Sequence, residues 1–202
     1  MLEPMTRSRT LTRPAVIDAA STLFATRGYR GTSMKDIAGA VGVSAPNLYN
    51  HLESKQDALV EIMNTTMDRG LIAMNRALAG VDDVSEQLFK ATESIVLQFL
   101  RHPHDVTVCG TEIYCLEETN QRVIIEKRRR YTSRIMEIIE NGCEQGRFAT
   151  EVPRVATFVV VEMGNNAKSW FRHSGDLRDI DLAKHYGEFA LRIVGDRGSL
   201  PQ

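Results

Sequence analysis

The sequence predicts an all-α protein in which a small N-terminal three-helix unit is followed by a larger helical domain. Apolar residues recur at helical spacing along most of the 202 residues, and no run alternates apolar and polar residues as a half-buried strand does. Capping and breaking residues divide this pattern into about nine or ten helical segments. The composition, 43% hydrophobic and 25% charged, is that of an ordinary globular protein.

The first three predicted helices are short and close together. One begins after Thr12 and ends at Gly28, a residue type that commonly terminates helices. Ser33 to Asp36 have the S-x-x-D form of a capping box and open a second helix, which ends at Gly42. Ser44 can cap a third helix only a few residues later.

A longer fourth helix begins at a second capping box, Ser54 to Asp57, and is expected to run to Gly80. Its length suits a connection between two domains. The acidic pair Asp82-Asp83 separates it from further amphipathic segments. These segments are expected at 84–101, 105–118, 120–145, 152–172 and 181–194.

Positive charge is concentrated near the N-terminus, although the net charge is only -1. Residues 1–55 carry seven Lys/Arg and four Asp/Glu (+3), whereas residues 56–202 carry 18 and 22 (-4). A DNA-binding module needs this sign, because contacts to phosphate supply most non-specific affinity.

The glycine turn between the second and third helices, braced by the first, is typical of a helix-turn-helix, whose second helix enters the major groove of DNA. An ordinary helical hairpin has the same periodicity. The pattern alone therefore leaves both interpretations open.

Residues 17–59, IDAASTLFATRGYRGTSMKDIAGAVGVSAPNLYNHLESKQDAL, resemble the DNA-binding domain of the TetR family almost position for position. The resemblance implies a homodimeric transcriptional repressor that binds a palindromic operator and is released by a small hydrophobic effector. Two positions depart from the family pattern: Leu52 stands where Phe is common, and Gln56 stands where Glu is frequent. The matching positions are Ala19-Ala20, Leu23-Phe24, Gly28-Tyr29, Thr32, Ile37-Ala38, Gly42-Val43-Ser44, Leu48-Tyr49, His51 and Ser54-Lys55.

The resemblance also implies which residues meet double-stranded DNA. Asn47 and Asn50 can bond base edges through their amides, Tyr49 would lie along the backbone, and Lys55 would contact phosphate. Ala45 and Pro46 offer apolar contact to a thymine methyl. The full predicted set is Thr32, Ser33, Lys35, Ser44, Ala45, Pro46, Asn47, Tyr49, Asn50, His51 and Lys55.

Three arginines, Arg7, Arg9 and Arg13, precede this domain. They form a basic arm that could enter the minor groove, or a flexible tail that is merely solubilising. We therefore expect an arm at 1–11, a DNA-binding domain at 12–72, and a ligand-binding and dimerisation domain at 73–202.

The last two long helices carry apolar stripes. In the family, such a pair forms a four-helix bundle with its copy in the partner subunit, although the same stripes would also suit an intramolecular core. The stripes are Val155, Phe158, Val159, Met163 and Trp170 on one helix, and Phe189, Leu191, Ile193 and Val194 on the other.

Polar groups within apolar helices are the candidates for an effector cavity, because burying them without a partner is costly. The candidates are Glu112, Tyr114, Tyr131, Asn165, Asn166 and Trp170.

The C-terminal segments, including ENGCEQGRF, resemble TetR-type regulators of fatty-acid and steroid breakdown, which commonly sense acyl-CoA thioesters. A basic cluster could meet CoA phosphates or form a solvated helix face. Its members are Arg122, Lys127, Arg128, Arg129, Arg130 and Arg134. Drugs as effectors, a protein partner in place of a small molecule, and activation instead of repression stay open as alternatives.

Motifs of the main alternative class, an enzyme, are missing from the sequence. It has no H-E-x-x-H, no phosphate-cradling glycine loop and no G-x-S-x-G, so we expect neither catalysis nor a cofactor or metal. No apolar run reaches the roughly 18 residues of a membrane span, and the N-terminus lacks a signal peptide, which predicts a cytoplasmic protein. Cys109, Cys115 and Cys143 fit reduced, structural thiols.

Overall fold

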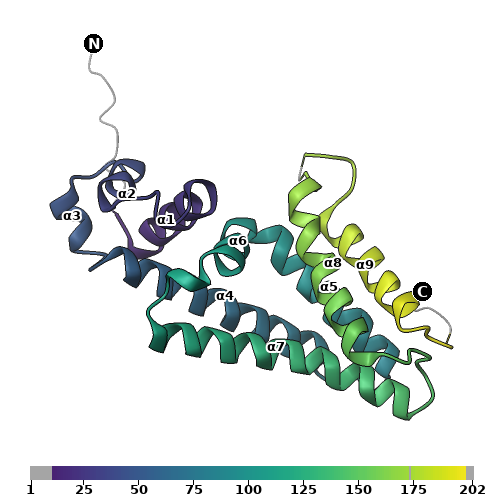
Figure 1. Ribbon diagram of the computed structural model, residues 1–202. Helices are drawn as coiled ribbons and strands as arrows, with labels where there is room; N and C mark the ends of the chain where they lie inside the picture. Colours follow the sequence, from purple (N-terminus) through teal and green to yellow (C-terminus); the bar gives the residue numbers. More distant parts are fainter. Residues whose placement is uncertain (1–10, 173, 199–202) are drawn as a thin grey trace.

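The computed structural model describes residues 11–172 and 174–198. Nine α-helices and one short 3-10 helix follow one another in these residues, and no described residue lies in a strand. The first three helices and the start of α4 form a small unit at one end, and the other helices form a larger bundle (Figure 1). None of the described helices is long and apolar enough to cross a membrane. The predicted all-α class and its two-part organisation are confirmed.

The small unit contains α1 (Arg13–Arg27), α2 (Met34–Ala40) and α3 (Ala45–Tyr49). The predicted capping box is present: the Ser33 hydroxyl accepts a bond from the Asp36 N–H (3.2 Å), and the Asp36 carboxylate accepts one from the Ser33 N–H (2.8 Å). Gly42 turns the chain between α2 and α3 with φ +73°, a conformation that side chains disfavour.

Helix α4 (Lys55–Leu78) runs from the small unit into the bundle without a break. The boundary expected at residue 72 therefore lies inside a helix. The core of the small unit also continues past this boundary, because Phe24 and Ile37 share a cluster with Val108 of a later helix. The two parts of the chain are thus joined by a helix and by common apolar packing.

Helix α5 is the central helix of the bundle and packs against α4, α7, α8 and α9. The segment expected as one helix over 105–118 is instead α6 followed by a 3-10 turn. The α-helical hydrogen-bond pattern ends at Glu112. Ile113 and Leu116 then pack into the same apolar cluster as Phe24 and Ile37. The bundle helices are α5 (Val84–Arg101), α6 (Pro103–Thr111), η1 (Ile113–Cys115), α7 (Glu118–Glu144), α8 (Pro153–Trp170) and α9 (Asp179–Ile193).

Candidate DNA-binding surface and effector cavity

The outer face of α2 and α3 carries most of the side chains predicted to meet DNA. Leu48 of α3 and Leu52 just after it are fully buried and hold α3 against the rest of the small unit, which leaves the opposite face of α3 in solvent. Tyr49 on that face is 54% exposed. The exposed residues of the predicted set are Ser33, Lys35, Ser44, Pro46, Asn47, Tyr49 and Asn50, and Ala45, His51 and Lys55 are partly buried.

The prediction for Thr32 is wrong. Its side chain is 1% exposed, and its hydroxyl donates to the Gly28 carbonyl at 2.9 Å. The buried Thr32 side chain thus bridges the two ends of the loop between α1 and α2. It therefore cannot be presented to a phosphate.

Lys55 has an intramolecular role that the sequence did not indicate. Its ammonium donates to the carbonyls of Tyr29 and Thr32, both at 2.8 Å, and lies 4.2 Å from the centre of the Tyr29 ring. An ammonium has three N–H donors, so at most one remains for a phosphate.

Arg13 belongs to α1 and not to a flexible arm, which corrects that expectation. Its guanidinium contacts the carboxylates of Asp57 (3.0 Å) and Glu61 and donates to the His51 carbonyl. The hydrogen bonds that the guanidinium donates to Glu61 and then to Asp57 raise the pKa of Arg13 above its ordinary value. Arg13 thus fixes α1 to the start of α4, while Arg7 and Arg9 lie outside the described residues.

Gln56 joins the small unit to the bundle. Its amide Nε2 donates to the Tyr29 hydroxyl (2.9 Å) and the Cys115 carbonyl (3.2 Å), and its Oε1 accepts from the Glu117 N–H (3.0 Å). An ionised glutamate could not donate to the Cys115 carbonyl. The departure from the family pattern at this position therefore has a structural reason.

Asp105 of α6 makes a second connection between the two parts. One carboxylate oxygen accepts a bond from the Ser21 hydroxyl of α1, and the other lies 3.1 Å from Nη1 of Arg69 on α4. Beside it, His104 Nδ1 lies 3.2 Å from the Thr22 hydroxyl. Among the described residues, no three His, Cys, Asp or Glu side chains are grouped as a metal site.

A cavity of about 360 Å³ lies inside the bundle, between α4, α5, α6, α7 and α8. Of the six predicted ligand-binding residues, Tyr131 and Asn165 line it. A Cβ at Gly70 would stand 3.1 Å from the Tyr131 ring, so this glycine lets the ring pack on α4. The lining residues are Thr66, Met67, Gly70, Gln98, Phe99, Val106, Cys109, Gly110, Arg128, Tyr131, Thr132, Phe158, Val161, Glu162 and Asn165.

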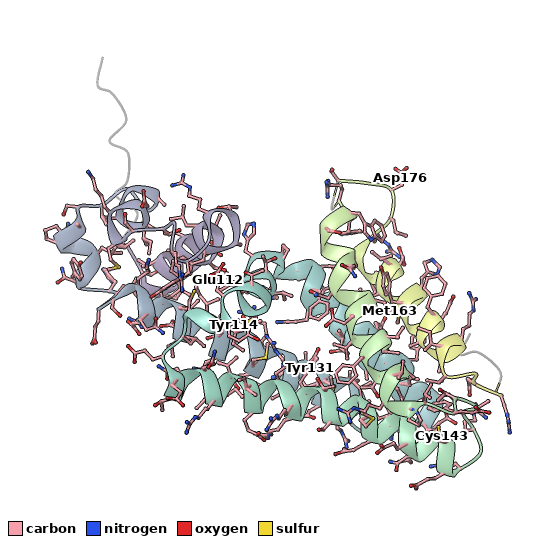
Figure 2. The ribbon with its side chains drawn as sticks, in the orientation of Figure 1. Glu112, Tyr114, Tyr131, Cys143, Met163 and Asp176 are labelled. Carbon is pink, nitrogen blue, oxygen red and sulfur yellow. The ribbon has the colours of Figure 1, made fainter. Side chains whose placement is uncertain are left out.

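The other four predicted ligand-binding residues lie outside this cavity. Tyr114 is 84% exposed on η1, and Glu112 accepts bonds from its neighbours Thr111 and Cys115 near α1, whereas Tyr131 lies in the middle of the bundle (Figure 2). Asn166 and Trp170 are exposed on α8. Tyr114, Asn166 and Trp170 are thus polar or amphipathic residues at the surface, whereas Glu112 is partly buried against its neighbours.

The cavity adjoins a basic groove along α7 and α8. The two share Arg128, Thr132 and Phe158, and the groove also contains Arg129 and Arg154 together with the carboxylates of Glu137 and Glu140, so three cationic side chains face two anionic ones. Arg128 reaches across to α6, where it donates to the Cys109 carbonyl at 2.6 Å. The cavity thus has one cationic side chain, that of Arg128, where it meets the groove.

The predicted basic cluster divides into two groups. Arg128 and Arg129 line the groove. The others named in ion pairs have carboxylate partners outside the groove or on their own helix: Lys127 contacts Asp68 of α4 (2.7 Å), and on α7 itself Arg134 contacts Glu137 (3.1 Å) and Arg122 contacts Glu118. Arg130 is exposed.

All three cysteines are free thiols, and Cys109 lies in the cavity wall. Burial raises the pKa of the Cys109 thiol to about 11. The thiol therefore stays protonated near neutral pH and offers the cavity a weakly polar surface.

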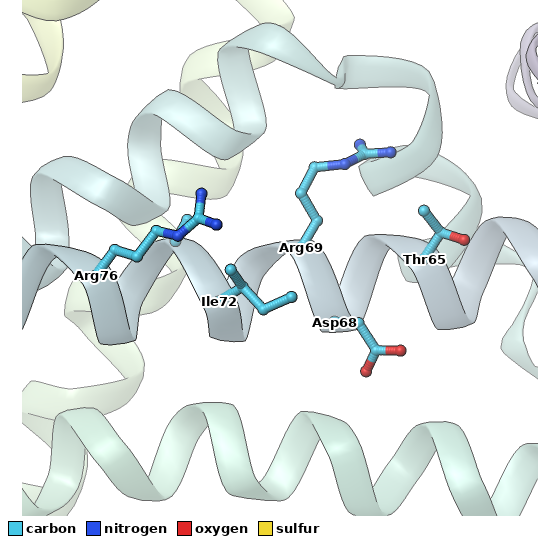
Figure 3. A pocket seen from close by; sticks show the side chains of 6 residues that line it. Thr65, Asp68, Arg69, Ile72 and Arg76 are labelled. Atoms are coloured by element: carbon cyan, nitrogen blue, oxygen red, sulfur yellow. The ribbon is translucent and has the colours of Figure 1, made fainter.

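A shallow depression on α4 is a weaker site. Its lining comes from one helix only, so it cannot enclose a small molecule (Figure 3). The lining residues are Thr65, Asp68, Arg69, Ile72, Ala73 and Arg76.

Comparisons with known proteins agree with this architecture. Residues 81–194 match the model for the Tetracyclin repressor-like, C-terminal domain, and residues 16–62 match that for Bacterial regulatory proteins, tetR family. The HTH-type transcriptional repressor KstR2 of Rhodococcus jostii is 26% identical over 190 residues, which is 89% of each chain.

Two solved structures are similar throughout. The TetR family regulator PfmR from Thermus thermophilus superposes with a TM-score of 0.79 at 29% identity, covering 96% of this chain and 100% of that one. AibR, solved with isovaleryl coenzyme A and operator DNA, has a TM-score of 0.78 at 24% identity over 91% and 98% of the two chains, which shows a shared fold. With matched models over both its N-terminal unit and its bundle, the chain belongs to the TetR family and is a DNA-binding transcriptional regulator, not an enzyme.

Proposed function

We propose that the protein is a homodimeric repressor that binds a palindromic operator and leaves it when an acyl-CoA thioester enters the bundle. The cavity and its adjoining basic groove carry this proposal. At about 360 Å³ the cavity is at the small end for ligand pockets, so an acyl group suits it and a whole CoA does not. Arg128, Arg129 and Arg154 would then meet the CoA phosphates in the groove, since guanidinium pairs well with phosphate.

The relatives support the two halves of this proposal. KstR2 is named as a repressor, and AibR was solved with isovaleryl coenzyme A and operator DNA, which supports a CoA thioester as the ligand class. We assign residues 12–72 to DNA binding and residues 73–202 to effector binding and dimerisation, with the arm at 1–11.

Fluorescence polarisation at one stated salt concentration tests the effector class. The probes are DNA from the region upstream of the gene, with isovaleryl-CoA, octanoyl-CoA, free CoA or hydrophobic drugs. Release by a thioester, but not by free CoA, supports the proposal. Release by drugs alone, or by none of these compounds, contradicts the proposed acyl-CoA effector but not the proposed operator binding.

Variants of the groove sharpen this test. Arg154→Gln is expected to weaken thioester binding about 5- to 100-fold, because a charge-assisted bond to phosphate is lost. Arg122→Gln is the matched control, since Arg122 pairs with Glu118 on the outside of α7. Equal effects of the two substitutions would place the CoA moiety elsewhere.

Asn47 and Tyr49 are expected to act differently on DNA. Asn47→Ala should cost about 1–3 kcal/mol on the operator and relax base preference at one position, because a base-edge contact is lost. Tyr49→Phe should weaken operator and random DNA alike, since the hydroxyl would contact the backbone. Binding of both DNA classes measures this, with the exposed Asn141→Ala as control. Equal losses on both DNA classes for Asn47→Ala would remove its reading role.

A further inference from the structure

Gln98 is a buried polar side chain without a partner in the wall of the cavity. It lies on α5, is 8% exposed, and its amide Nε2 has no hydrogen-bond partner among the described residues. A buried, unsatisfied donor is rare in folded proteins and destabilises them. Such a group calls for a specific explanation.

The other buried polar residues of α5 are satisfied by the protein. The Ser85 hydroxyl donates to Asp196 (2.8 Å), and the Thr92 hydroxyl donates to the Leu88 carbonyl (2.8 Å). Neither of them lines the cavity, whereas Gln98 does. The unsatisfied donor therefore occurs at the one place on α5 where a ligand could satisfy it.

The surroundings of Gln98 suit a ligand that is mostly hydrocarbon. Met67, Phe99, Val106 and Val161 supply apolar wall. The last side-chain torsion of glutamine is soft, so a small rotation turns the Nε2 donor toward a bound molecule. Other polar side chains also line the cavity, but among the described residues the Gln98 amide is the one wall donor that is fully buried without a partner, so it favours an acceptor atom at its own depth.

We propose that Gln98 donates a hydrogen bond to an oxygen atom carried on the acyl group of the effector. The preferred effector is then an oxygenated acyl-CoA, such as an oxo-acyl thioester, and not a plain saturated one. This inference rests on the proposed function, because it takes the acyl group to occupy the cavity. It adds the acyl group's chemical class and the residue that recognises it.

A ladder of thioesters tests the inference directly. Octanoyl-CoA is compared with its 3-oxo, 5-oxo and 7-oxo derivatives by calorimetry on the wild-type dimer and on Gln98→Met, which keeps the side chain's length but removes the amide. At least one oxo derivative is expected to bind wild type about 10- to 100-fold more tightly than octanoyl-CoA. In Gln98→Met that preference is expected to disappear, while octanoyl-CoA binds at least as well as before.

Gln87→Met is the matched control on the same helix, because the Gln87 amide is already bonded to the Val81 carbonyl (2.6 Å) and does not line the cavity. It should keep the oxo preference. If octanoyl-CoA binds and no oxo derivative binds better, the inference is wrong and the proposed effector class survives. If no thioester binds, both are wrong.

The stability of the ligand-free protein gives a second test that needs no effector. Removing an unsatisfied buried donor should raise the melting temperature of Gln98→Met by about 2–4 °C. A lower melting temperature would mean that the amide is satisfied in the free protein, for example by a fixed water, and would overturn the inference.

Discussion

Val159→Arg is expected to convert the protein to a monomer and to weaken operator binding by roughly 100-fold or more, because avidity between two half-sites is lost. Val159 is 45% exposed on α8, and Val155 (56%) and Phe158 (48%) lie beside it at helical spacing. On α9, Phe189 (45%) and Ile193 (36%) add a second exposed apolar strip. An arginine in the centre of a surface that pairs with its own copy would have to bury its charge.

The matched control is Ile72→Arg. Ile72 is 51% exposed on the outer face of α4, beside Arg69 and Arg76 (Figure 3), so an added charge there remains in solvent. Light scattering after size-exclusion chromatography measures the mass, and polarisation measures operator affinity. A dimeric Val159→Arg variant with unchanged operator binding would place the dimer interface elsewhere.

The structure divides these stripes between the surface and the core of the subunit. Leu191 and Val194, assigned to the same stripe as Phe189 and Ile193, are fully buried in the core of their own subunit. Apolar periodicity marks which residues avoid water, but it does not distinguish a neighbouring helix from a partner subunit. The helices themselves were predictable because capping boxes and glycine turns are local signals.

The same limit explains the errors in the site. Thr32 was expected to face DNA because it precedes a helix, yet its hydroxyl donates inward to the Gly28 carbonyl. Lys55 likewise has carbonyl partners that only the folded chain brings near. Gln98 was missed, although the criterion that selected Tyr131, a polar group in an apolar helix, applies equally to it. Only the folded structure shows that the Gln98 amide has no hydrogen-bond partner.

Asp105→Asn is expected to separate effector binding from operator release. Asp105 lies on α6, which also supplies Val106, Cys109 and Gly110 to the cavity wall. Its carboxylate joins α6 to Ser21 of α1 and to Arg69 of α4. An effector that shifts α6 would therefore move the helix that supports the DNA-binding surface. A coupling of about 1–3 kcal/mol, or roughly 5- to 150-fold in operator affinity, is typical of such regulation.

In Asp105→Asn the ratio of operator affinities without and with effector should fall towards one, while effector affinity measured without DNA changes little. Ser21→Ala should lower the ratio as well, and adding it to Asp105→Ala should change nothing further, because alanine at position 105 already leaves the Ser21 hydroxyl without its acceptor. Asp68→Asn is the control, since the Asp68–Lys127 pair (2.7 Å) joins α4 to α7 without touching α1. If Asp105→Asn keeps the full wild-type ratio, the signal does not pass through this carboxylate. Helix α4, the bonds of Gln56 and the apolar core that both parts share would then be the remaining routes.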